Sequence, residues 1–146
     1  MTAFAFVFPG QGSQTVGMLD AWGDNPAVRQ TLAEASDALG EDVAKLIREG
    51  PKERLDLTSN TQPVMLTAGI ACYRAWMAQT NRPPALVAGH SLGEYTALVA
   101  AGSLRIMVLN SSSVRLPSTR IKVLRRRGAK RSARVSISAM PLAVLR

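Results

Sequence analysis

The residues with the clearest chemical potential stand at 89–93, which read Gly-His-Ser-Leu-Gly. The apolar residues 85–89 predict a short buried strand, and residues 94–101 predict a helix. A serine at such a junction, with glycine two residues away on either side, is typical of a nucleophile elbow, a strained turn that projects the hydroxyl above a sheet. The first N–H groups of the helix favour negative charge that develops there. Ser91 is therefore the candidate nucleophile.

A second loop could approach a ligand with its backbone. Residues 3–8 read Ala-Phe-Ala-Phe-Val-Phe, which predicts a short strand, and Pro9-Gly10 marks the turn that ends it. The loop at 10–14 is rich in glycine and amides, so its backbone N–H groups can come close to a bound group. It is not a dinucleotide-binding fingerprint, because Thr15 stands where the third glycine belongs. An ordinary turn is the alternative interpretation of this loop.

Helices must position these two loops. Glycines and prolines that punctuate apolar stretches predict helices over 25–39, 42–49 and 63–79. Gly40 is the expected stop of the first helix. Residues 58–60 are N-cap candidates for the third, and Pro63 would lie in its first turn. Cys72, inside this mostly apolar third helix, is predicted to be a small core residue.

Three blocks of the sequence together resemble the malonyl-CoA:acyl carrier protein transacylase family. They are Phe-Pro-Gly-Gln-Gly-Ser-Gln at 8–14, Asn-Thr-Gln-Pro at 60–63 and Gly-His-Ser-Leu-Gly-Glu-Tyr-Thr-Ala-Leu-Val-Ala-Ala-Gly at 89–102. The resemblance covers residues 1–104, the N-terminal part of such an enzyme. It implies an α/β fold that forms an incomplete α/β-hydrolase-like acyltransferase core with a nucleophile elbow. The family's ferredoxin-like subdomain is expected to be absent. The strand pattern that follows Met1 directly resembles a stand-alone bacterial enzyme.

The resemblance also assigns roles to single residues. It implies that Ser91 is the catalytic nucleophile, and that the backbone N–H groups of Gln11 and Leu92 form the oxyanion hole. Gln62 matches an active-site amide that binds substrate. His90 matches the histidine beside the serine, which contacts substrate and is not the base. The residues agree about His90, because neighbouring side chains on a tight turn point in different directions.

The reaction implied by this resemblance moves malonyl from coenzyme A to acyl carrier protein through an acyl-enzyme, within fatty acid biosynthesis. Malonyl-CoA and acyl carrier protein are the expected partners, and coenzyme A is a substrate, so no cofactor and no metal are expected. No membrane partner is expected, because no apolar stretch reaches 18 residues. The single cysteine excludes an internal disulfide, and no secretory signal precedes the first strand. A cytoplasmic protein is predicted.

The charge divides the chain at residue 104. Residues 1–104 hold 7 Lys and Arg against 10 Asp and Glu, whereas residues 105–146 hold 11 Lys and Arg and no acid. Arg, Ser and Leu, which have the most codons, supply 21 of the last 42 residues. We therefore predict two parts, the acyltransferase part at 1–104 and a basic tail at 105–146 that is out of frame and disordered or weakly helical.

Two other functions stay open at this stage. A serine esterase or hydrolase of the α/β-hydrolase type shares the elbow, but it needs a histidine after the serine, and His90 is the only histidine. For the same reason we expect this chain itself to be inactive in malonyl transfer. A truncated product without enzymatic activity, with a tail that binds nucleic acid, is the second alternative. The tail has no aromatic residue for base stacking, so no specific nucleic acid partner is expected.

Overall fold

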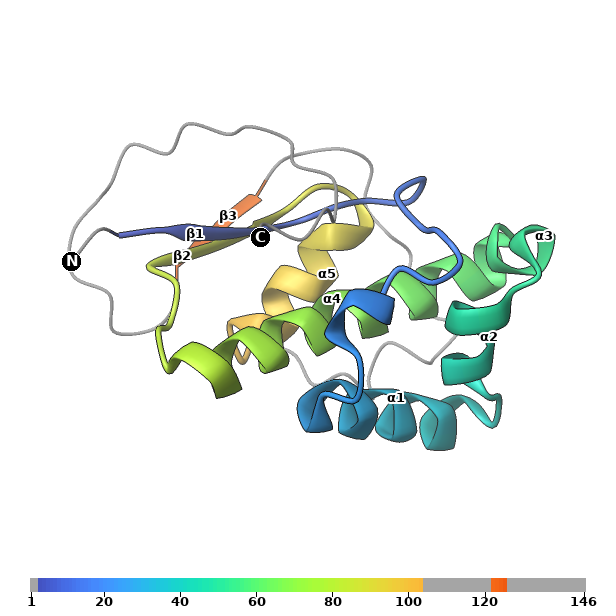
Figure 1. Cartoon of the computed structure of the whole chain (residues 1–146). Coiled ribbons are helices and arrows are strands. Elements are labelled where there is room, and N and C mark those ends of the chain that lie inside the picture. Colours follow the sequence, from blue (N-terminus) through green and yellow to red (C-terminus); the bar gives the residue numbers. More distant parts are fainter. Residues whose placement is uncertain (1–2, 104–121, 126–146) are drawn as a thin grey trace.

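A computed structural model describes residues 3–103 and 122–125. Its sheet has the order β1-β2-β3, formed by β1 (Ala5–Phe8), β2 (Leu86–Gly89) and β3 (Lys122–Arg125). Strands β1 and β2 pair in parallel with Phe8 opposite Gly89, and β3 pairs with β2 antiparallel. The parallel pairing places the carboxyl ends of β1 and β2 at the same edge of the sheet (Figure 1). Ligands of α/β proteins bind at this kind of edge.

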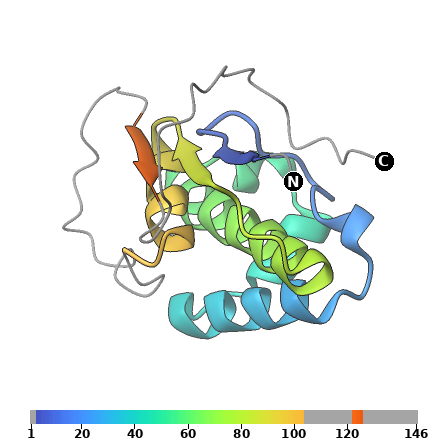
Figure 2. The ribbon, with the colours of Figure 1, turned by 90° about the vertical axis from the view of Figure 1, so that its left-hand side faces the viewer.

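Helices pack on the sheet in two further layers (Figures 1 and 2). The long helix α4 lies between the sheet and α1, and α5 lies beside α4 and against β1 and β2. The helical elements are η1 (Asp20–Trp22), α1 (Pro26–Leu39), α2 (Val43–Glu49), α3 (Lys52–Leu55), α4 (Thr58–Thr80) and α5 (Leu92–Ala100). The predicted α/β fold class is confirmed, and α5 begins two residues before the predicted start.

Gly40 ends α1, as the sequence predicts, and Asn25 is its N-cap. The Asn25 side chain accepts hydrogen bonds from the backbone N–H groups of Ala27 (2.9 Å) and Val28 (3.4 Å). Gly40 closes the helix in the left-handed region, at φ 67°. In α2, the Asp42 carboxylate accepts from the Lys45 N–H at 2.8 Å. Both helices therefore follow from local capping rules.

The start of α4 differs from the prediction. Helix α4 begins at Thr58 with Leu57 as N-cap, so residues 58–60 are inside the helix and do not cap it. The backbone N–H of Thr61 donates to the Leu57 carbonyl at 2.7 Å, which closes the first helical turn there. Pro63 therefore lies inside the helix, and it is tolerated because the carbonyl that loses its partner belongs to exposed Ser59, where water can bind.

Two hydrophobic cores hold the layers together. One joins α1, α2, α3 and α4, with Leu55 fully buried and Ile47 2% exposed. Cys72 lies in this core, as predicted, and burial raises the pKa of its thiol. The other core joins the sheet to α4 and α5 through Phe8, Val87 and Ala97. Beside this core, edge-to-face ring contacts join the N-terminal segment to α4, between Phe4, Phe6 and Phe8 on one side and Tyr73 and Trp76 on the other.

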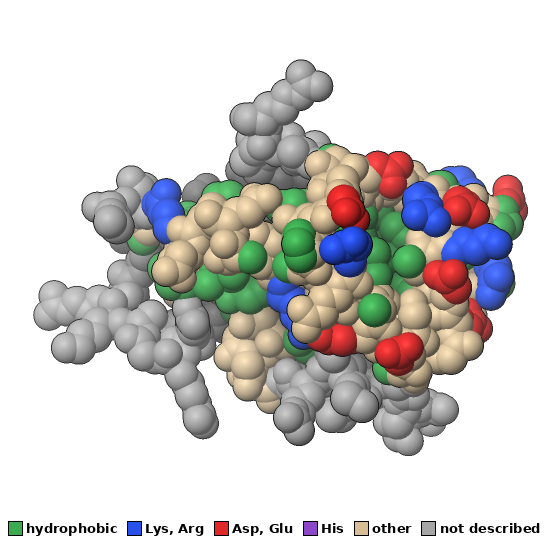
Figure 3. Space-filling view, turned by 60° about the horizontal axis from the view of Figure 1, so that its bottom comes forward, with side chains coloured by type: hydrophobic (Ala, Val, Ile, Leu, Met, Phe, Trp, Pro, Cys, Tyr) green, Lys and Arg blue, Asp and Glu red, His purple; other side chains and the backbone are tan. Residues whose placement is uncertain are grey.

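Strand β1 carries one exposed apolar side chain. Val7 points away from α4 and is 42% exposed, whereas all four residues of β2 are buried. On the face seen in Figure 3, acidic and basic side chains are interspersed over the end that carries α2 and α3. No helix among the described residues is both long and apolar enough to cross a membrane.

The tail is described only at Lys122–Arg125. These four residues form β3, where disorder or a weak helix is predicted, and the prediction for the tail as a whole stays a prediction. Backbone pairing with the edge of β2 offers an extended conformation that composition alone does not reveal. The remaining tail residues, and with them the prediction of a nucleic-acid-binding segment, lie outside the described residues.

We expect the ion pair between α1 and α4 to make stability depend on pH. Arg74 Nη1 donates to Glu34 Oε2 at 2.7 Å and to Thr31 Oγ1 at 3.0 Å. The hydrogen bond from Arg74 holds the pKa of the Glu34 carboxyl below its usual value of 4.5. The stabilisation by this ion pair is therefore fully present at pH values above the usual pKa of a glutamate carboxyl. It is lost as the pH falls through the lowered pKa of Glu34.

Glu34→Gln tests this pH dependence. Both side chains of the pair are more than one third exposed. The variant is therefore expected to lose about 0.2–1 kcal/mol of its free energy of unfolding at neutral pH. Urea denaturation at pH 7 and pH 3 measures it, and Glu53→Gln is the control, because Glu53 forms no ion pair among the described residues. A Glu34→Gln deficit that is the same at both pH values would contradict the prediction.

Candidate active site

Ser91 occupies a strained position between β2 and α5. It follows the strand by two residues and is the N-cap of the helix, with φ 54° and ψ −119°. A residue with a Cβ rarely adopts a positive φ, and such strain concentrates at functional sites. Ser91 is exposed, so a substrate can reach the hydroxyl from solvent.

Two glycines allow the backbone to fold back at this turn. A Cβ added at Gly89 would lie 1.9 Å from the Gly93 carbonyl oxygen, and one added at Gly93 would lie 2.2 Å from the Phe8 carbonyl oxygen. Both distances are far below van der Waals contact, so no side chain fits at either position. The Gly93 N–H donates to the His90 carbonyl at 2.9 Å and so starts the helix directly after the turn.

The loop after β1 lies against the Ser91 turn. A Cβ at Gly10 would lie 3.0 Å from the His90 carbonyl oxygen and 3.5 Å from the Ser91 Cβ. The His90 N–H donates to the Phe8 carbonyl at 3.4 Å, which joins the two strand ends. The two blocks that the sequence singles out at 10–14 and 89–93 are therefore neighbours in the structure.

Two backbone N–H groups near Ser91 are available to a bound oxygen. Among the described residues, no acceptor pairs with the N–H of Gln11 or with that of Leu92. Leu92 is the first residue of α5, where the helix leaves its N–H groups without partners in the helix itself. Gln11 follows Gly10, whose own neighbours are His90 and Ser91.

The side chains of the other two predicted site residues, His90 and Gln62, form no hydrogen bond with described residues. The His90 side chain is exposed, next to Ser91 on the same turn. Gln62 is half-buried in α4, and its amide forms no hydrogen bond with any described residue. Gly10, His90 and Ser91 thus lie close together, with Leu92 next along the chain, whereas Gln62 forms no hydrogen bond with any of them. Within the described residues, no three His, Cys, Asp or Glu side chains are grouped to hold a metal ion.

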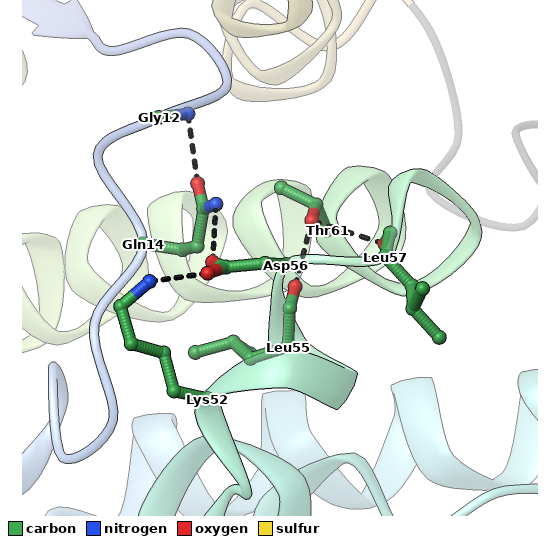
Figure 4. A network of polar contacts seen from close by, with 7 residues as sticks. All are labelled: Gly12, Gln14, Lys52, Leu55, Asp56, Leu57 and Thr61. Atoms are coloured by element: carbon green, nitrogen blue, oxygen red, sulfur yellow. Dashed lines mark hydrogen bonds and ion pairs between the residues drawn. The ribbon is translucent and has the colours of Figure 1, made fainter.

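Sequence reasoning missed a polar network that ties the glycine-rich loop to α3 (Figure 4). Gln14 accepts a hydrogen bond from the Gly12 N–H (2.8 Å) and donates one to Asp56 Oδ1 (2.9 Å). Lys52 pairs with the other oxygen of Asp56. The contacts of Lys52 and then of Gln14 hold the pKa of the Asp56 carboxyl below its usual value. We call this set, Gln14, Asp56 and Lys52, the Gln14 bridge.

Comparison with known proteins identifies the class of protein. The family described as "Acyl transferase domain" matches residues 5–133, and the chain belongs to this family. The match runs past the predicted boundary at residue 104, which stays a prediction.

Within this family, relatives with high sequence identity to the chain are malonyl CoA-acyl carrier protein transacylases. That of Escherichia coli (strain K12) is 60% identical over 103 residues, 70% of this chain and 33% of the relative. That of Salmonella typhimurium is 53% identical over 125 residues, 85% of this chain and 39% of the relative. The chain therefore spans about a third of the length of these relatives.

Solved structures agree with this assignment. An acyl-carrier-protein S-malonyltransferase from Burkholderia pseudomallei 1710b has a TM-score of 0.71 and is 64% identical, with 73% of this chain and 35% of that chain covered. A malonyl-transacylase in complex with a type II PKS acyl-carrier protein has a TM-score of 0.69 and is 51% identical, with 73% and 35% covered. These similarities extend the family assignment from sequence to three-dimensional structure.

Proposed function

We propose that Ser91 stands on a nucleophile elbow and is the residue that becomes acylated. The observation that carries this proposal is the positive φ of Ser91 between β2 and α5, with Gly89 and Gly93 packed too closely for any side chain. A protein retains such strain where the geometry is needed. Exposure of Ser91 at the carboxyl end of β2 leaves the hydroxyl open to an acyl donor.

The oxyanion hole of this proposal consists of the N–H groups of Gln11 and Leu92. Attack on a thioester carbonyl places negative charge on its oxygen, and preorganised N–H donors stabilise that charge. The Leu92 donor also benefits from the N-terminal end of the α5 dipole. Neither group donates to another described residue, so each is free to meet the oxyanion.

The reaction is a two-step malonyl transfer. The Ser91 Oγ forms a bond to the thioester carbonyl carbon of malonyl-CoA, the carbon–sulfur bond breaks, and coenzyme A leaves as the thiol with the proton that serine loses. The thiol sulfur of acyl carrier protein then forms a bond to the ester carbonyl carbon, the bond from that carbon to Ser91 Oγ breaks, and the serine regains the proton that the thiol loses. Gln62 and His90 bind substrate. The chemistry consumes no cofactor and no metal, and it takes place in the cytoplasm.

Support for the choice of substrate comes from relatives. Proteins that are 60% and 53% identical to this chain are named malonyl CoA-acyl carrier protein transacylases. A structural neighbour was solved with an acyl-carrier protein bound. Malonyl-CoA and acyl carrier protein are therefore the proposed partners.

A chimera tests the proposed function. Residues 1–103 of this chain, fused to the remaining part of the Escherichia coli relative, are expected to transfer radiolabelled malonyl from coenzyme A to acyl carrier protein. Ser91→Ala in the same chimera is the matched control and is expected to abolish transfer. Hydrolysis of p-nitrophenyl esters without malonyl transfer would contradict the proposal and support the esterase alternative.

A further inference from the structure

The glycine-rich loop is fixed at both of its ends, and Gln11 lies between the two attachments. At one end, Gly10 lies so close to the Ser91 turn that an added Cβ would be 3.0 Å from the His90 carbonyl oxygen and 3.5 Å from the Ser91 Cβ. At the other end, the Gly12 N–H donates to the Gln14 side chain at 2.8 Å. Because the peptide groups on either side of Gln11 are held, the direction of the Gln11 N–H is set by these two contacts.

The second attachment depends on residues far away in the sequence. Gln14 donates to Asp56, which lies 42 positions later, and Asp56 pairs with Lys52 one turn earlier in α3. Asp56 thus orients the Gln14 amide, so that its oxygen faces the Gly12 N–H and its nitrogen faces the carboxylate (Figure 4).

Asp56 is itself anchored to α4. Thr61 is fully buried, and its hydroxyl donates to the Leu55 carbonyl at 2.6 Å while lying 3.0 Å from the Leu57 carbonyl. These two carbonyls flank Asp56, so the buried hydroxyl fixes the backbone that carries the carboxylate. The contacts therefore run from the core of α4 through Asp56 and Gln14 to Gly12.

We propose that Gln14 is a positioning residue, held by Asp56 and Lys52, that aims the Gln11 N–H at the oxyanion formed on Ser91. This inference rests on the proposed function of Ser91 and of the Gln11 N–H. Gln14 does not touch the substrate in this account. It acts through Gly12 and through the shape of the loop between Gly10 and Gln14.

The test measures loop order and serine reactivity separately in the 146-residue chain. Gln14→Leu is expected to speed hydrogen exchange of the Gly12 amide by roughly two- to tenfold, the effect of losing one hydrogen bond. It is also expected to slow labelling of Ser91 by a fluorophosphonate by about tenfold, less than the roughly 10²–10³-fold that removing an oxyanion donor costs. Asp24→Asn, which breaks an exposed ion pair elsewhere, is the control and is expected to change neither rate.

A rescue experiment separates positioning from a merely structural role. Gln14→Glu keeps the acceptor for Gly12 but places a carboxylate against Asp56, so labelling slows. Adding Asp56→Asn restores a donor toward position 14, and labelling is expected to return toward the wild-type rate. A double variant no faster than Gln14→Glu would overturn the inference.

The outcomes distinguish the two proposals. If the wild-type chain is labelled at Ser91 and Gln14→Leu is labelled equally fast, the role of Gln14 is wrong while the role of Ser91 stands. If Gly12 exchange is unchanged in Gln14→Leu, the role of Gln14 is wrong as well. A wild-type chain whose Ser91 is not labelled would contradict the proposed nucleophile, and with it any positioning role.

Discussion

Alanine at Gly89 or Gly93 is expected to destroy the turn that carries Ser91. The added Cβ would lie 1.9 Å from the Gly93 carbonyl oxygen in the first case and 2.2 Å from the Phe8 carbonyl oxygen in the second. Both neighbours are backbone atoms, which cannot rotate away as a side chain would. Relief requires that β1, β2 and α5 move apart. We therefore expect either variant to lose more than about 4 kcal/mol of its free energy of unfolding, which is beyond the usual range for one substitution.

Gly40→Asn is the matched control for these alanine variants. Gly40 is also a backbone-determined glycine, at φ 67°, but no atom lies within 4 Å of an added Cβ there. Asparagine tolerates this left-handed conformation, so little stability should be lost. Urea denaturation and fluorophosphonate labelling of Ser91 measure the effects. A Gly89→Ala or Gly93→Ala chain that unfolds cooperatively at the wild-type midpoint would contradict the close packing.

The strand, turn and helix around Ser91 could be predicted because their determinants are local. Two glycines, a serine and the apolar residues on either side fall within about one strand and one helix of sequence. The same is true of α1, whose Asn25 cap and Gly40 stop lie next to the helix that they delimit. Local capping and turn rules read such features directly from neighbouring residues.

Features that depend on distant residues could not be predicted. Gln14 and Asp56 lie 42 positions apart, and neither residue type signals the other. The N-cap of α4 is Leu57 and not one of residues 58–60, because the short helix α3 ends just before it. The sequence did not predict α3. Strand β3 exists only as a partner of β2. Pairing across the sheet overrides a composition that favours no regular structure.

The polypeptide of these 146 residues is expected to transfer malonyl at least about 10³-fold more slowly than the chimera with the Escherichia coli relative. A serine hydroxyl is a weak nucleophile at neutral pH unless a base takes its proton. Loss of one member of a catalytic triad leaves only the residual catalysis of the oxyanion hole and of binding. His90 is the only histidine in the sequence. Because it directly precedes Ser91 on a tight turn, we expect it not to serve as that base.

Parallel assays show whether the 146-residue polypeptide lacks only the general base or lacks a reactive Ser91 as well. Both polypeptides are incubated with radiolabelled malonyl-CoA and acyl carrier protein, each with its Ser91→Ala variant, and both are labelled with a fluorophosphonate. We expect both wild-type forms to be labelled at Ser91 and the chimera alone to turn over, because the reactive probe needs less help from a base than the thioester does. Turnover by the 146-residue polypeptide that disappears in Ser91→Ala would contradict this prediction. His90→Ala would then show whether that side chain accepts the proton, since a lowered kcat at saturating malonyl-CoA, and not a raised KM alone, would assign His90 the role of base.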